Sequence, residues 1–167
     1  MKANKATFAV RAVCFLIATL LGPPVFAETD VHESAAGHEA KHDYHRNQLS
    51  VFVGHTGETR REHGNTLGIG YERRITKTVG VGVLLERTYG DFDFKVYALP
   101  IAYHAGLWKI FVAPGVEDGE HGSESLVRMG AEYAFEVGSW EIAPQLSIDF
   151  VGGEKLGIIG IALAKGF

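Results

Sequence analysis

The sequence predicts an all-β fold: an eight-stranded antiparallel up-and-down barrel that crosses a membrane, preceded by a cleaved signal peptide. Three observations support this prediction. Apolar and polar residues alternate in eight segments after residue 47, as in strands with one buried face. Short and long connections alternate between these segments. Glycine is abundant, with 21 residues in 167, and inside the apolar segments each glycine disfavours a helix by about 1 kcal/mol.

The first 27 residues have the pattern of a secretory signal. Lys2, Lys5 and Arg11 form a basic start, and an apolar run over residues 12–21 follows. Val25 and Ala27 then offer compact side chains at the two positions that a signal peptidase reads, so we expect cleavage after Ala27. The apolar run is too short for a membrane-spanning helix, which needs about 20 apolar residues.

Removal of the signal leaves an acidic chain without cysteine. Cys14 is the only cysteine and lies in the signal, which excludes disulfides and thiol chemistry in the mature chain. The signal also takes three of the 16 basic residues, so 13 remain against 20 acidic residues, a net charge of −7. Such a chain lacks the basic surface that nucleic acid requires, and we expect no nucleic-acid partner.

Residues 28–47 are expected to form a flexible periplasmic leader, because they are polar and show no sustained apolar period. Four histidines stand among its acidic residues, at His32, His38, His42 and His45. Imidazole is a ligand for zinc, copper or nickel, but this spacing fits no fixed site. We interpret the leader as a solvated tail, with metal collection as the alternative, and predict no structured metal site and no cofactor.

The barrel domain is predicted over residues 48–167, with each strand close to the 9 to 11 residues that cross a bilayer. The expected strands are residues 48–55, 66–75, 79–87, 94–105, 108–116, 125–137, 140–151 and 156–167. Tight turns at 76–78, 106–107 and 138–139 are typical of hairpins, and longer outer loops are expected at 56–65, 88–93 and 117–124, with a shorter one at 152–155. This alternation places the short turns and both termini on one side.

The two faces of the expected strands differ in chemistry. Between residues 79 and 86, for example, aliphatic residues alternate with Gly80, Gly82 and Glu86. Because an eight-stranded barrel has little interior room, we expect the bulky face to meet lipid and the other face to line the lumen; a soluble periplasmic barrel with the opposite arrangement is the alternative. The predicted lumen charges are Glu72, Arg74, Glu86, Lys109, Arg128, Glu132, Glu136, Glu141 and Asp149.

Aromatic residues lie near the short turns, where membrane barrels carry a ring of aromatic side chains at the membrane–water interface. We call this ring the girdle. The predicted girdle residues are Tyr71, Tyr103, Trp108, Phe135 and Trp140. The last strand also closes on an aromatic residue, Phe167.

Over residues 48–167 the sequence resembles the small eight-stranded bacterial outer-membrane β-barrels, the group of the membrane domain of outer membrane protein A and of outer membrane protein X. The resemblance implies that Phe167 is the signal read by the outer-membrane assembly machinery. We accordingly expect an integral outer-membrane monomer in contact with outer-membrane lipid and lipopolysaccharide.

Three prolines depart from this pattern, because Pro100, Pro114 and Pro144 fall inside expected strands. Proline cannot donate to a β-ladder, so each is expected to mark a bulge or a strand end.

A loose resemblance to the His-x-Ser plus Glu arrangement of outer-membrane lipid A deacylases occurs at Glu120, His121, Ser123 and Glu124. A hydroxyl nucleophile needs a base within hydrogen-bond reach, and a solvated loop does not hold one rigidly. We therefore predict no catalytic residue and no enzyme.

The predicted function is a structural or surface-interaction role with a lumen plugged by paired charges. A narrow pore for small, preferably cationic solutes is the first alternative, and a lipid A-modifying enzyme is the second. Fold alone does not choose among them.

Overall fold

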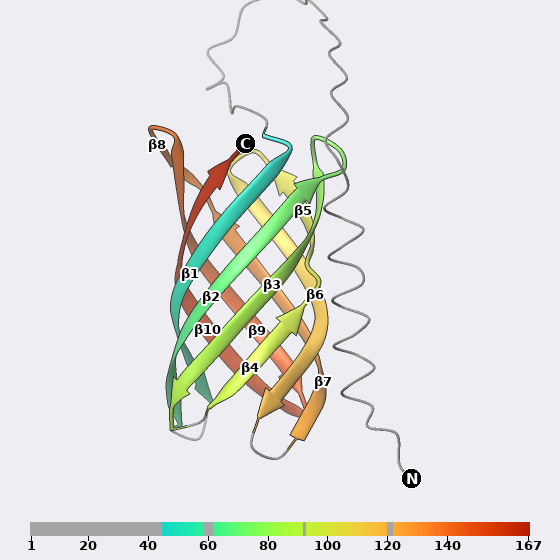
Figure 1. Cartoon of the computed structure of the whole chain (residues 1–167), viewed down its shortest axis with the longest axis vertical. Coiled ribbons are helices and arrows are strands. Elements are labelled where there is room, and N and C mark those ends of the chain that lie inside the picture. The colour runs from blue at the N-terminus through green and yellow to red at the C-terminus, as the bar shows by residue number, and fades with distance from the viewer. Residues whose placement is uncertain (1–44, 59–61, 92, 120–121) are drawn as a thin grey trace, which may run out of the picture. The chain divides into compact units, whose positions relative to one another are not determined.

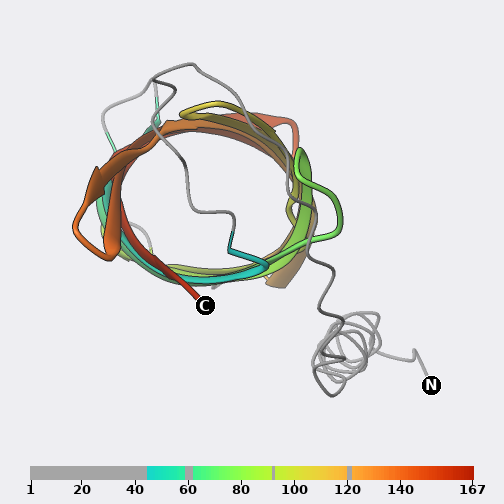
Figure 2. The same ribbon diagram turned by 90° about the horizontal axis from the view of Figure 1, so that it is seen from above.

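The computed structural model describes residues 45–58, 62–91, 93–119 and 122–167. Within these residues ten antiparallel strands form one sheet that closes on itself (Figures 1 and 2). The strands are β1 (Asn47–Glu58), β2 (His63–Arg74), β3 (Val79–Gly90), β4 (Phe94–Ala98), β5 (Ile101–Ala105), β6 (Trp108–Gly119), β7 (Gly122–Tyr133), β8 (Phe135–Val137), β9 (Trp140–Val151) and β10 (Glu154–Gly166). Among the described residues no helix has the length and apolar character of a membrane span.

The ten strands make eight spans, because two of the spans are briefly interrupted. β4 and β5 pair with β3 in one register, from Leu84 opposite Ala98 to Val81 opposite Ile101. β7 and β8 likewise share one register on β9, with Ala134 between them. Pairing of β1 with β10 closes the ring. The predicted eight-stranded antiparallel barrel is confirmed.

The prolines disturb the barrel less than the sequence predicts. Pro100 does separate β4 from β5, but its carbonyl accepts a hydrogen bond from the Gly82 amide at 2.9 Å and the register continues. Pro114 and Pro144 lie inside β6 and β9 with no bulge and no strand end. The expectation is therefore confirmed at Pro100 and wrong at the other two, because one missing donor leaves the remaining hydrogen bonds of a 12-residue strand in place.

The long outer loops are also a wrong prediction. The strands continue through most of the polar residues assigned to loops, so that the connections are only residues 59–62, 91–93, 120–121 and 152–153. Polar side chains do not interrupt a ladder when the backbone stays paired, as shown by Thr66, which pairs directly with Thr88. We call this end of the barrel the loop end, and the opposite end, where Phe167 and the turns 75–78, 106–107 and 138–139 lie, the turn end (bottom and top of Figure 1).

The outer surface of the barrel is apolar on all eight spans. Large aliphatic side chains such as Ile110, Leu146 and Ile159 are 57%, 62% and 63% exposed. The opposite face of the strands is buried, and it carries more than the glycines and charged residues expected to line the lumen. Aliphatic and aromatic side chains also pack inside, namely Phe52, Phe94, Val96, Phe111, Leu126, Val151, Leu156 and Ile158.

Candidate functional site in the barrel lumen

The centre of the lumen is crossed by a buried cluster that we call the arginine cluster: Arg128, Glu86 and Asp149. From β7, Arg128 donates to both carboxylate oxygens of Asp149 on the adjacent strand β9, at 2.6 and 2.8 Å. Its third contact, from Nη1 to Glu86 Oε2 at 2.5 Å, reaches β3. Since β4 and β6 separate β3 from β7 in the sheet, this single side chain joins distant parts of the barrel wall.

The arginine cluster is almost entirely removed from solvent. The side chains of Arg128, Glu86 and Asp149 are 1%, 1% and 0% exposed. Gly68 leaves space for the Glu86 side chain, because a Cβ at position 68 would lie 2.6 Å from Glu86 Cγ. Buried charges of this kind are stable only when paired and hydrogen-bonded. One oxygen, Glu86 Oε1, is buried without a hydrogen-bond partner in the described residues.

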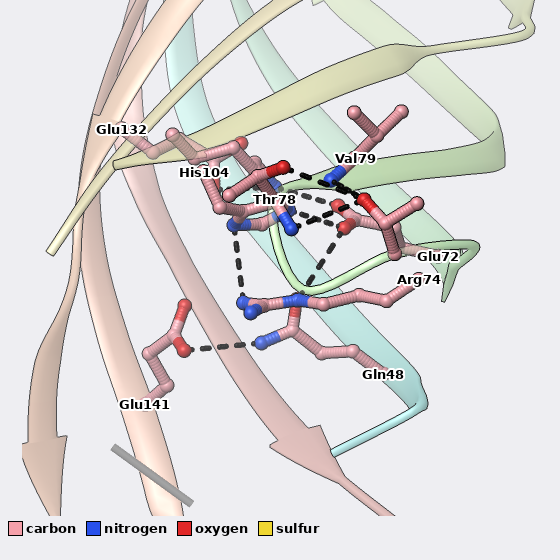
Figure 3. Close-up of polar contacts among 10 residues, drawn as sticks. Gln48, Glu72, Arg74, Thr78, Val79, His104, Glu132 and Glu141 are labelled. Atoms are coloured by element: carbon pink, nitrogen blue, oxygen red, sulfur yellow. Dashed lines mark hydrogen bonds and ion pairs between the residues drawn. The ribbon is translucent and has the colours of Figure 1, made fainter. Parts of the chain in front are cut away.

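A second group of charges lies toward the turn end, and we call it the turn-end cluster: Glu72, Arg74, His104, Lys109 and Glu132. Figure 3 labels all of them except Lys109. Lys109 Nζ lies 2.7 Å from Glu132 Oε2 and 3.5 Å from Glu72 Oε2. Four strands, β2, β5, β6 and β7, contribute to it. The cluster therefore links residues that are far apart in the sequence.

His104 is oriented by contacts on both ring nitrogens. Arg74 Nη2 lies 3.0 Å from His104 Nδ1, and Glu72 Oε1 lies 2.5 Å from His104 Nε2. A guanidinium group can only donate, so Nδ1 accepts and the proton resides on Nε2, which donates to Glu72. His104 thus bridges Arg74 and Glu72 through two hydrogen bonds.

Layers without charge complete the filling of the lumen. At the loop end the hydroxyl groups of Thr56, Thr66 and Thr88 form a buried chain with oxygen separations of 2.5 and 2.8 Å. Apolar side chains including Val96 and Leu126, 1% and 2% exposed, pack in the same barrel interior. Together with the arginine cluster these groups occupy the interior toward the loop end.

Toward the turn end the lumen opens into a cavity. It encloses about 530 Å³ of empty space, including its open mouth, and is lined by Gln48, Ser50, Phe52, Glu72, Lys109 and Glu132 among others. Part of the wall is therefore apolar and part belongs to the turn-end cluster. Glu86, Arg128 and Asp149 of the arginine cluster do not line this cavity.

The predicted lumen charges differ in how deeply they are buried. Glu72, Glu86, Arg128, Glu132 and Asp149 are buried. The side chains of Arg74 and Lys109 are 23% and 20% exposed. Glu141 is half-buried and accepts a hydrogen bond from Gln48 at 3.1 Å. Glu136 pairs with Glu141 on β9 but is exposed, because β8 is a short hairpin strand at the turn end.

Several lumen residues were not singled out from the sequence. His104 and the three threonines of the hydroxyl chain belong to this group, as do Gln48 and Gln145. Alternation is the signal that finds His104, since Ala102 and His104 lie inward and alternate with the outward Ile101, Tyr103 and Ala105. Neutral polar residues give a weaker signal than charges.

The predicted girdle residues lie on the outer surface toward the turn end. Tyr103, Trp108, Phe135 and Trp140 are between 46% and 54% exposed, and Tyr71 is half-buried with its hydroxyl 2.9 Å from Asn47 Oδ1. The main chain of Phe167 exchanges hydrogen bonds with that of Asn47 at 2.9 and 3.1 Å, which ties the end of the chain to β1. A role for these residues at a membrane surface stays a prediction.

The residues that suggested a deacylase are only partly described. Ser123 is exposed and donates a hydrogen bond to Asp118 Oδ1 at 2.6 Å. Glu124 is exposed on the same strand, β7, whereas Glu120 and His121 lie outside the described residues.

The signal, its cleavage after Ala27 and the leader up to residue 44 also lie outside the described residues. In the segments that the structure does describe, no group of three or more His, Cys, Asp or Glu side chains is arranged to hold a metal ion.

The closed ring of eight spans has the fold of the small eight-stranded outer-membrane β-barrels, which confirms the resemblance expected from the sequence. Similar structures include the N-terminal barrel domain of Pseudomonas aeruginosa OprF, with 11% identity, a TM-score of 0.52 and coverage of 74% of this chain and 100% of that one. Ail, the attachment invasion locus protein of Yersinia pestis, is 13% identical with a TM-score of 0.50, covering 72% and 97%. A de novo designed transmembrane β-barrel is 15% identical with a TM-score of 0.51, covering 70% and 94%. Neither protein-family models nor curated proteins match the sequence. At these identities the similarity shows the fold alone.

Proposed function

We propose that the protein is an integral protein of the bacterial outer membrane that serves as a rigid scaffold with a sealed lumen. The observation that carries this proposal is the distribution of side chains: large apolar residues are exposed on every span, while charged residues are paired inside. Exposed apolar surface of this extent is costly in water and matches a lipid environment. The likeness to outer-membrane barrels of Pseudomonas aeruginosa and Yersinia pestis supports the location.

In this proposal the turn end faces the periplasm, as do the short turns and termini of outer-membrane barrels. Phe167 is then the signal for the assembly machinery. The surface offered to partners consists of strand ends, because the connections at the loop end are too short to form extended binding loops. At that end Arg87 donates to both Asp93 oxygens at 3.2 and 2.9 Å, and these hydrogen bonds hold the pKa of the Asp93 carboxyl below its usual range.

The sealed lumen separates this proposal from a narrow pore. We expect the purified protein in planar bilayers to show no steady conductance, because the arginine cluster and the apolar layers fill the interior. Arg128→Ala should introduce intermittent, cation-preferring openings, since Glu86 and Asp149 remain as unneutralised carboxylates. An appreciable conductance that is the same in both proteins would show that ions pass the barrel without meeting the arginine cluster, and would reject the sealed scaffold.

The enzyme alternative makes a different prediction. If the barrel does not modify lipid A, mass spectra of lipid A from cells producing the protein and cells producing Ser123→Ala will show the same acylation. A loss of acyl chains that depends on Ser123 would replace the scaffold proposal by a hydrolase.

A further inference from the structure

Two histidines lie side by side on the outer surface of the barrel at its loop end. His55 on β1 pairs with Asn65 on β2, and His63 on β2 pairs with Gly57 on β1, so the histidines are diagonal neighbours across one strand pair. Both are exposed. Their ring centroids are 5.3 Å apart, with 27° between the ring planes. Two neutral imidazoles held this close can both donate a nitrogen lone pair to one metal cation.

Asn65 determines which nitrogen of His55 is available to a ligand. His55 Nδ1 lies 3.4 Å from Asn65 Oδ1. An amide oxygen only accepts, so this contact places the proton on Nδ1 and leaves the lone pair of Nε2 free. Histidines that bind metals are oriented in the same way, by donating their other N–H group to an oxygen.

His63 is held in position by Asp91. The backbone amide of His63 donates to Asp91 Oδ2 at 3.0 Å, and the Asp91 amide donates to the His63 carbonyl at 3.0 Å. The ring itself lies over Gly57, where an added Cβ would stand 3.0 Å from His63 Nδ1. A side chain at position 57 would crowd the imidazole, so glycine there keeps the ring beside His55.

We propose that His55 and His63 form a binding site for a divalent late transition-metal ion such as Zn²⁺, Ni²⁺ or Cu²⁺. With Zn–N bonds of 2.0 to 2.1 Å in a tetrahedral arrangement, the centroids of two coordinated imidazoles lie about 5.2 Å apart, close to the separation of this pair. The rings are stacked in the structure, so binding requires each exposed ring to turn until its free nitrogen points to the ion. Water fills the remaining positions, since two imidazoles supply only half of a tetrahedral shell. A site of this composition exchanges its metal readily and would collect metal ions at the surface rather than stabilise the fold.

The test is zinc titration by calorimetry of the full mature chain in detergent micelles. To remove the leader's contribution, His32, His38, His42 and His45 are all changed to alanine in a background variant. This background should still bind one zinc ion per barrel. His55→Ala and His63→Ala should each weaken binding at least tenfold, and Asn65→Ala about tenfold, because loss of the residue that orients a ligand typically costs 10- to 100-fold in metal affinity.

Two controls make the result decisive. Ser125→Ala, an exposed residue on β7 toward the same end, should leave zinc binding unchanged, and gel migration before and after boiling shows that each variant keeps its closed barrel. Calcium should give no heat, because it prefers oxygen ligands. The proposal is overturned if the background variant does not bind zinc, if folded His55→Ala and His63→Ala bind it as tightly as the background, or if calcium competes with zinc, which would assign the site to Asp91 or nearby glutamates.

Discussion

Replacing Arg128 by methionine is expected to lower the free energy of unfolding by about 3 to 5 kcal/mol, the cost of leaving the partners of a buried ion pair uncompensated. Methionine fills much of the same volume but donates no hydrogen bond. Glu86 and Asp149, whose side chains are 1% and 0% exposed, would then remain as buried carboxylates without a cation. Urea unfolding of the barrel in lipid vesicles, followed by tryptophan fluorescence, measures this loss.

The matched control for Arg128→Met neutralises the partners as well. In a triple variant that adds Glu86→Gln and Asp149→Asn, most of the lost stability should return, because no unpaired charge remains. Arg128→Lys should be intermediate, since an ammonium group cannot reproduce the two parallel hydrogen bonds to Asp149. A loss below about 1 kcal/mol in Arg128→Met, the range of solvent-exposed ion pairs, would show that water reaches the arginine cluster.

The composition of the arginine cluster could be predicted from the sequence, but its geometry could not. Alternation alone places Arg128, Glu86 and Asp149 on the inward face of their strands. The contact between Arg128 and Asp149 depends on the register of β7 with β9, and strand alternation says nothing of register. The contact with Glu86 depends on closure of the sheet, because the two residues come from strands that are not adjacent.

The unpredicted lumen residues and the wrong strand boundaries share one cause, which is that backbone pairing and not residue type decides where a strand continues. The polar character of residues 56–65 predicts a loop, yet Thr56 lies in β1, faces inward and shares a hydrogen bond with Thr66. Pro100 drew attention to a break in the fourth span, although alternation continues through it and brings His104 inward to Glu72. The close pairing of His55 with His63 likewise follows from the β1–β2 register, which no local pattern reveals.

Which face meets lipid is tested by a charge on the outer surface. Leu146, in the middle of β9, is 62% exposed. If this surface lies in hydrocarbon, Leu146→Arg should cost about 2 to 4 kcal/mol of stability in lipid vesicles, as charges do at the midplane of outer-membrane barrels. The measurement is urea unfolding together with the fraction of protein that migrates as a folded barrel before boiling.

Ser125→Arg provides the matched comparison, because Ser125 is also exposed but lies toward the loop end of β7. The same charge there should cost only about 0 to 1 kcal/mol, since the penalty falls near the interface. A soluble barrel gives the opposite result: an exposed leucine in water is replaced by arginine at no cost, and both variants stay folded without detergent. Equal, small effects at the two positions would therefore contradict the membrane location, whereas a large difference requires an apolar medium around the middle of the barrel.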